Sequence, residues 1–417
     1  MADYPIDDPS SAARGAFSAL RHRDFRLYWI GACVSFVGSW VQIVAMGLFV
    51  YERTGSTEAL GLVGLVGGLP TLALMLFGGA IADRVDRRRA VLLTQSLFAL
   101  NALALTALTA TGLVQFWHIL TVSFVSGVVF AVDGPARQSI IHDMVGPEDL
   151  ASGVALQSAA FNVARVLGPA IGSVLYTQFG PAWCFLTNAL SFAAIIVAVL
   201  CVRTTIRVPM EPSENVLAGF AEGMRSVAAN PTQKTVLLLT AATSLSAFSV
   251  YSTLMPAIAQ DRLGVYEGDR RYGYLFSAIG VGALMGAYCV GRFAQARRRG
   301  ALMVAGALAF SVALFLLAHV NRFEAALAIF VLIGVAAVSQ LATANTLTQT
   351  LAPPGFSGRA VSLHMFAMAG MQPIGAFIAG LVAQRMGVPF ALAAGASVLL
   401  AASIALLARR PAIARLP

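Results

Sequence analysis

The chain has 417 residues, of which 58% are hydrophobic and only 11% are charged. Soluble globular proteins carry about 25% charged residues, so this composition excludes a water-soluble enzyme and assigns most of the chain to lipid. The net charge of +9 does not indicate a nucleic-acid-binding protein, because the chain holds a single lysine, Lys234, and no solvated basic domain.

Residues 1–26 form a polar N-terminal segment, which we expect in the cytoplasm. The segment includes Asp3, Asp7 and Asp8 and has no short apolar run before a small-residue cleavage site. These features differ from those of a secretory signal peptide, so we expect the segment to precede the first membrane span.

Twelve apolar stretches follow, and a helix needs roughly 20 apolar residues to cross the hydrocarbon core. They predict an all-α membrane protein with twelve transmembrane helices in two pseudo-symmetric six-helix halves. The N-terminal half is expected at 27–202 and the C-terminal half at 234–408, followed by a cytoplasmic tail at 409–417. The expected spans are 27–51, 58–82, 90–111, 116–141, 151–178, 181–202, 234–259, 272–292, 300–319, 323–350, 359–384 and 387–408.

The basic residues predict the orientation of these spans. Most of the 28 lysines and arginines fall on the side that holds the N-terminus, and cytoplasmic loops are the ones that carry an excess of basic residues. An even number of spans returns the chain to the side on which it began. We therefore expect a multi-pass protein of the bacterial inner membrane with both termini in the cytoplasm.

The interdomain loop at 203–233 contains apolar residues at helical spacing. Ser213 could cap a helix there and Pro231 ends it. An amphipathic helix on the inner membrane surface is favoured, and a solvated linker helix is the alternative. The apolar residues are Val216, Leu217, Phe220, Met224 and Val227.

The two halves resemble each other at an offset of 207 residues. Gly127 corresponds to Gly334 and Gly180 to Gly387, and Pro147 corresponds to Pro354. Parallel six-span repeats are a common architecture of secondary transporters, in which substrate binds near the midplane between the halves.

The loop after the second span reads GGAIADRVDRRR (78–89) and resembles the signature of the major facilitator superfamily. Asp86 stands where the signature has glycine, and an ordinary positive-inside cluster is the alternative interpretation. The resemblance implies a cytoplasmic gate formed by Gly79, Asp83, Arg84, Arg87 and Arg88, completed by Asp143 after the fourth span.

The fifth span contains RVLGPAIGS (165–173), which resembles the antiporter motif of the same superfamily through Gly168, Pro169 and Gly172. Ala155 and Ala164 stand where glycines are usual. In the superfamily this motif accompanies export, although such small residues also serve ordinary helix packing in membranes. With FRLYWIGACVSFVGSWVQ (25–42) and VDGPARQ (132–138), the motif resembles the branch that contains the enterobactin exporter and the macrolide efflux pumps.

Two charged residues lie well inside predicted spans, Asp133 in the fourth and Arg165 in the fifth. Charges at this depth are costly and usually functional. We expect Asp133 to exchange a proton during transport, with Arg165 or Arg137 setting its affinity. A structural ion pair lining a wet cavity is the alternative. Ser123 stands where many drug–proton antiporters carry arginine, so proton coupling is implied by the resemblance alone.

Polar residues at middle depth are candidate contacts of a substrate cavity. Each of them could instead form a helix–helix hydrogen bond. The candidates are Trp40, Gln42, Asn162, Ser249, Tyr251, Gln340, Asn345 and Gln372.

These features predict a secondary active exporter of a small organic molecule, working by alternating access with proton antiport. A siderophore or related secreted metabolite is the favoured substrate, and broad drug or macrolide efflux is the alternative. An intramembrane enzyme would need clustered catalytic residues at one depth, which the sequence lacks. The four cysteines are isolated, so we expect no metal site, and no P-loop is present, so we do not expect ATP to be the energy source. We also expect no cofactor and no nucleic-acid partner, and a monomer in the bilayer.

Overall fold

The computed structural model describes residues 15, 17–82, 86–203, 216–266, 269–293, 299–353, 356–411, 413 and 416, and these residues contain helices and no strand. A short 3-10 helix, η2 (Ser18–Arg21), precedes the first long helix. The N-terminal helices are α1 (Arg23–Thr54), α2 (Thr57–Ala82), α3 (Arg87–Ala110), α4 (Phe116–Phe179) and α5 (Pro181–Leu200).

Helix α4 crosses the bilayer twice. Its 64 residues would extend about 96 Å as a straight helix, roughly three times the hydrocarbon thickness. Gly146 interrupts it with φ 69° and ψ 175°, a conformation that glycine adopts without steric cost, and Pro147 follows. The helix therefore has a first arm (116–145) and a second arm (147–179), which correspond to the fourth and fifth predicted spans.

The remaining chain forms a second group of helices. The expected interdomain helix is present as α6 (Val216–Ala229), and Glu222 on it forms an ion pair of 2.8 Å with Arg359 on α12. The other elements are α7 (Pro231–Ala242), the π-helix η3 (Thr243–Phe248), α8 (Ser249–Ala257), the π-helix η4 (Ile258–Arg262), α9 (Arg271–Phe293), α10 (Arg299–His319), α11 (Phe323–Thr350), α12 (Ser357–Ala369), α13 (Met371–Met386) and α14 (Val388–Arg409).

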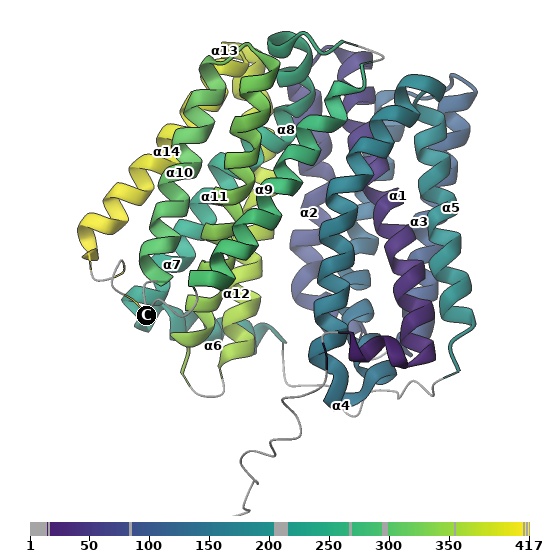
Figure 1. Ribbon diagram of the computed structural model, residues 1–417, viewed down its shortest axis with the longest axis horizontal. Helices are drawn as coiled ribbons and strands as arrows, with labels where there is room; N and C mark the ends of the chain where they lie inside the picture. The colour runs from purple at the N-terminus through teal and green to yellow at the C-terminus, as the bar shows by residue number, and fades with distance from the viewer. Residues whose placement is uncertain are drawn as a thin grey trace, which may run out of the picture.

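Eleven helical runs in the described chain are long and apolar enough to cross a membrane, with Pro231–Arg262 and Arg359–Met386 each forming one run. Because α4 crosses twice, the fold has the twelve crossings that the sequence predicts. Helices α1–α5 pack as one bundle and α7–α14 as another (Figure 1). The two bundles meet mainly through α2 with α13 and through α4 with α9. The exact domain boundaries stay predictions.

Helix α1 begins at the lower end of the molecule in Figure 1, and α14 runs downward toward that end. We call this the terminal end, and the other the opposite end. The turn at Gly146 lies at the terminal end, whereas the turns that follow α1 and α13 lie at the opposite end.

The repeat is visible in the geometry of matched glycines. Gly127 lies against the carbonyl of Gly67 on α2, and its counterpart Gly334 lies against the carbonyl of Ile279 on α9. Neither position leaves room for a side chain. Gly180 and Gly387 have φ of 85° and 87°, and both end one helix directly before the next.

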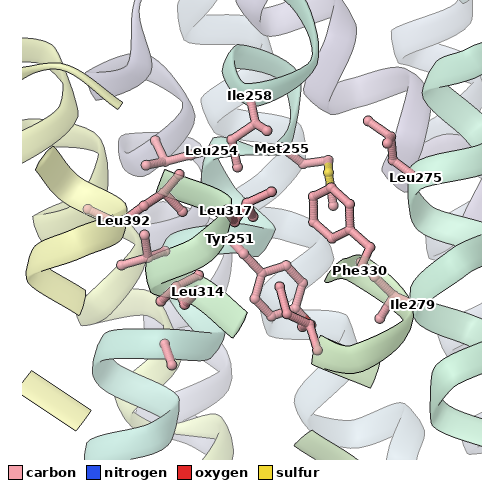
Figure 2. Packing of buried hydrophobic residues seen from close by; sticks show 14 of the residues in the cluster. Tyr251, Leu254, Met255, Ile258, Leu275, Ile279, Leu314, Leu317, Phe330 and Leu392 are labelled. Atoms are coloured by element: carbon pink, nitrogen blue, oxygen red, sulfur yellow. The ribbon is translucent and has the colours of Figure 1, made fainter. Parts of the chain in front are cut away.

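The largest hydrophobic cluster of the described residues extends through both bundles, and Figure 2 shows part of it in the C-terminal bundle. Side chains of α8 and η4 meet those of α9, α10, α11 and α14 there, so this bundle is closely packed around its first span. The labelled members are Tyr251, Leu254, Met255, Ile258, Leu275, Ile279, Leu314, Leu317, Phe330 and Leu392.

Candidate functional site

Asp133 lies in the first arm of α4, is 6% exposed and is held by α3. Its Oδ1 accepts hydrogen bonds from Thr94 Oγ1 and Gln95 Nε2, both at 2.6 Å. Its Oδ2 lies 3.0 Å from Nε of Arg137, one helical turn further along α4. The carboxylate therefore has a positive partner and two neutral donors, which offset the cost of removing it from water.

Arg137 connects this carboxylate to a third helix. Its Nη2 donates to Gln95 Oε1 at 2.8 Å and to Ser35 Oγ on α1 at 3.3 Å. Its guanidinium lies 5.2 Å from the centroid of the Phe36 ring. The result is a buried polar network, Asp133–Arg137–Gln95–Thr94–Ser35, that joins α1, α3 and α4.

Of the two arginines that the sequence offered as partners of Asp133, the structure brings Arg137 to it. Arg165 lies in the second arm of α4, 5.9 Å from the centroid of the Trp40 ring and in electrostatic contact with Tyr251 on α8. The sequence did not single out Thr94, Gln95 or Ser35. In the sequence each of them is only a polar residue within an apolar run. Their contact with the network of Asp133 can be predicted only once the packing of α1 and α3 against α4 is known.

The gate motif is brought together in part. Arg87 Nη1 lies 2.9 Å from both carboxylate oxygens of Asp143, and Arg88 Nη2 donates to the carbonyl of Leu200 at 2.8 Å. Asp86 accepts a hydrogen bond from the Arg89 backbone at 2.8 Å, so the residue that replaces glycine in the signature caps α3. Gly79 lies on α2, and Asp83 and Arg84 lie outside the described residues.

The antiporter-type motif packs the second arm of α4 against two neighbouring helices. Gly168 lies against Cβ of Trp40, and a Cβ added at Gly172 would be 3.1 Å from Cα of Val41, both on α1. The carbonyl of Pro169 faces Gly273 on α9, where an added Cβ would lie 2.6 Å away. The small residues therefore allow close approach within one half and across to the other.

Three cavity candidates are enclosed by helix packing. Ser249 is fully buried, and its hydroxyl donates to the carbonyls of Ser244 at 2.6 Å and Gln372 at 3.0 Å. Tyr251 is 2% exposed and lies in the cluster of Figure 2. Gln340 is fully buried, with no hydrogen-bond partner for its amide within the described chain. Ser249 therefore forms a helix–helix hydrogen bond, which was the alternative to a cavity contact, because Gly375 lets α13 approach it closely.

Four other candidates contact residues of the same helix or of a neighbouring helix in the same half. Gln42 Oε1 accepts from Asn188 Nδ2 on α5 at 2.7 Å, and Asn162 Nδ2 donates to the carbonyl of Ser158 at 2.8 Å. Asn345 Oδ1 accepts from Gln349 Nε2 at 3.2 Å. Trp40 lies 6.0 Å from Phe161, measured between ring centroids.

Several hydrogen bonds between the two halves lie at the opposite end, and no sequence pattern pointed to them. Tyr51 Oη donates to Asp261 Oδ2 at 2.6 Å, and Ser173 Oγ donates to the carbonyl of Arg270 at 3.0 Å. The Thr57 backbone donates to Gln384 Oε1 at 2.9 Å. We call these three interactions the opposite-end contacts. Each joins a residue of α1, α2 or α4 to a residue of the C-terminal half.

One carboxyl beside these contacts has a perturbed pKa. Burial raises the pKa of Asp269, but hydrogen bonds from the side chain and backbone of Arg271 outweigh burial and hold that pKa below its usual value. The two side chains form an ion pair of 2.6 Å. This ion pair thus fixes the backbone on either side of Arg270, whose carbonyl accepts the hydrogen bond from Ser173.

A family model described as the transmembrane secretion effector matches residues 14–414. The chain belongs to this family of the major facilitator superfamily. The multidrug efflux pump Tap of Mycolicibacterium fortuitum is 25% identical over 369 residues, covering 87% of this chain and 89% of the relative. The enterobactin exporter EntS of Shigella boydii is 27% identical over 392 residues, covering 93% and 92%.

Solved structures support the fold of this secretion effector. A nucleoside transporter NupG variant superposes with a TM-score of 0.76 at 12% identity, covering 92% of this chain and 99% of that one. The peptide transporter POT superposes with a TM-score of 0.75 at 16% identity, covering 99% of each chain. Because the family model covers residues 14–414, the chain is a multi-pass membrane transporter and not an enzyme. Within the described residues, no group of three His, Cys, Asp or Glu side chains could hold a metal ion.

Proposed function

We propose that this secretion effector exports a small organic molecule by alternating access of its two halves. The observation that carries the proposal is the placement of the opposite-end contacts, which join the halves at one end of a two-bundle fold. With the terminal end in the cytoplasm, as the basic residues predict, these contacts would keep substrate from leaving outward until the halves rock. The protein would act as a monomer in the bacterial inner membrane.

A siderophore or related secreted metabolite is the proposed substrate, and drug or macrolide efflux is the second candidate. The enterobactin exporter among the relatives supports the first candidate, and the multidrug efflux pump supports the second.

The buried network supplies a route for proton coupling. Protonation of Asp133 would neutralise the carboxylate that faces Arg137, and the guanidinium would then keep only Gln95 and Ser35 as partners. Because the network joins α1, α3 and α4, losing one charge would loosen three helices of the N-terminal half together. We propose that this step links proton entry to the rocking of the halves, and that protons are the coupling ion.

The test is uptake into inverted vesicles under an imposed pH gradient, comparing a catecholate siderophore with a macrolide. We expect accumulation of one of them above its external concentration. Asp133→Asn should lose at least 90% of the gradient-driven accumulation and keep downhill exchange, because the residue can no longer release a proton. Glu324→Gln, which removes an exposed carboxylate in the first turn of α11, is the control and should behave as wild type.

Two results would contradict the proposal. Wild-type vesicles that take up neither compound, with or without the gradient, would reject export of these substrate classes. An Asp133→Asn variant that accumulates substrate as well as wild type would reject coupling through Asp133 and leave export itself standing.

A further inference from the structure

Arg165 differs from every other charge discussed above because it lies inside a span without a carboxylate partner. The described residues contain no acid in ion-pair contact with it, whereas Arg137 pairs with Asp133 and Arg87 with Asp143. A charge at the centre of a membrane helix costs about 2.5–3.5 kcal/mol on insertion scales. A structural role would be expected to include a counter-ion, and the described part of the chain supplies none here.

The neighbours of Arg165 are aromatic and come from both halves. Trp40 on α1 lies 5.9 Å from the guanidinium, and Tyr251 on α8 of the other half is in electrostatic contact with it. Phe161, one turn before Arg165, packs on Trp40 and is 43% exposed. A guanidinium beside ring faces can bind a carboxylate or phenolate while the rings stack on a planar group.

Arg165 also lies where a substrate has to bind if the halves alternate. The backbone around it is in contact with the C-terminal half, since a Cβ added at Gly280 on α9 would be 3.2 Å from Cα of Val166. Ser277 on α9 donates to the carbonyl of Val166 at 2.8 Å. The guanidinium thus lies at the junction of the two halves, where transporters of this architecture hold their substrates.

We infer that Arg165 binds the anionic group of an aromatic substrate, with Trp40 and Phe161 flanking the ring. This inference rests on the proposed export function and adds to it the chemical class of the cargo, a planar aromatic acid or a molecule that carries one. A bound anion would compete with Tyr251 for the guanidinium. Substrate binding would thereby weaken a contact between the halves, which ties recognition to their movement.

The experiment uses the full-length protein in proteoliposomes and two probes of equal size. These are 2,3-dihydroxybenzoate, an anion at neutral pH, and 2,3-dihydroxybenzamide, its neutral counterpart. We expect wild type to bind the benzoate at least tenfold more tightly, measured by calorimetry and by competition with the transported compound. Arg165→Gln should abolish this preference and bind the amide within threefold of wild type.

Arg53→Gln is the matched control, because Arg53 also lies over an aromatic ring, Phe49 at 5.3 Å, but near the end of α1. It should keep the benzoate preference. Arg165→Met, which suits an apolar surrounding, replaces Arg165→Gln if the latter does not fold, and the same loss is expected.

The outcomes separate this inference from the export proposal. Wild type that transports a siderophore or macrolide but binds benzoate and benzamide equally would overturn the inference alone. A neutral Arg165 variant that keeps the preference, or that loses both probes equally, would also overturn it. Wild type that transports nothing would instead overturn the proposed function.

Discussion

A single buried ion pair shows how this protein tolerates charge inside the membrane. Asp133 and Arg137 are each less than 10% exposed, and together they are neutral. Removing one partner of a buried pair strands the other without compensation, whereas removing both leaves only neutral groups. The pair is therefore best examined as a unit.

Arg137→Met should destabilise the protein by about 3–5 kcal/mol, because Asp133 would keep only Thr94 and Gln95 as donors. The double variant Asp133→Asn, Arg137→Met should recover at least half of the lost stability. Thermal unfolding in detergent measures both effects, with Arg53→Met as the control for removing an arginine. Equal melting temperatures for the single and double variants would contradict this interpretation.

Sequence reasoning reached Asp133 and Arg137 but not the rest of their network. A charge within an apolar run is visible without any fold, since no soluble surface is available to it. Gln95 and Ser35 are ordinary polar residues until α1 and α3 are placed beside α4. For the same reason, Ser249 and Tyr251 were expected in a cavity, whereas the packing of α13 and α10 encloses them.

At the scale of elements, glycines set how closely helices approach. Gly168 faces Trp40 and the carbonyl of Val37 on α1, and an added Cβ would have to displace Cβ of Trp40 and the backbone of Val37. Gly134, on the first arm of the same helix, has nothing within 4 Å of the position of a Cβ. The two glycines therefore predict opposite effects of the same substitution.

Gly168→Ala should lower stability by about 1–3 kcal/mol by forcing α4 away from α1. Gly134→Ala should be neutral or raise stability by up to about 1 kcal/mol, because alanine favours a helix interior. Melting temperatures of the two variants in one detergent measure the difference. If both shift equally, Gly168 is not a packing constraint.

Most of the elements were predictable because lipid imposes their length. The turn between the arms of α4 was signalled by the polar run HDMVGPED, and Gly146 supplies the required backbone conformation there. The π-helical segments η3 and η4 were not predictable. They depend on how the first span of the C-terminal half packs against its neighbours, which no local pattern encodes.

For the whole molecule, the arrangement of the two halves depends on the contacts that join them at the opposite end. The contacts of Gly61 with Gly380 and of Gly68 with Pro373 bring α2 and α13 close from the opposite end to middle depth. The opposite-end contacts add hydrogen bonds to this packing. Alternating access requires them to break and reform in each cycle.

Tyr51→Phe should shift the protein toward separation at the opposite end, because Asp261 loses the hydroxyl that joins it to α1. A hydrogen bond of about 1 kcal/mol corresponds to roughly a fivefold change in the ratio of the two states. Spin labels at the exposed residues Leu113 and Tyr266, one in each half, report the change as a larger population at long distance. The labels are introduced after replacing Cys33, Cys184, Cys201 and Cys289.

Tyr288→Phe is the control, since Tyr288 is 74% exposed on α9 and its loss should leave the distances unchanged. Tyr51→Phe should also bind a substrate added on the side of the opposite end more readily, because the hydrogen bond between Tyr51 and Asp261 helps to close that end. An unchanged distance distribution in Tyr51→Phe would mean that glycine packing between α2 and α13 alone keeps this end closed. The hydrogen bond would then have no part in setting the balance between the two states.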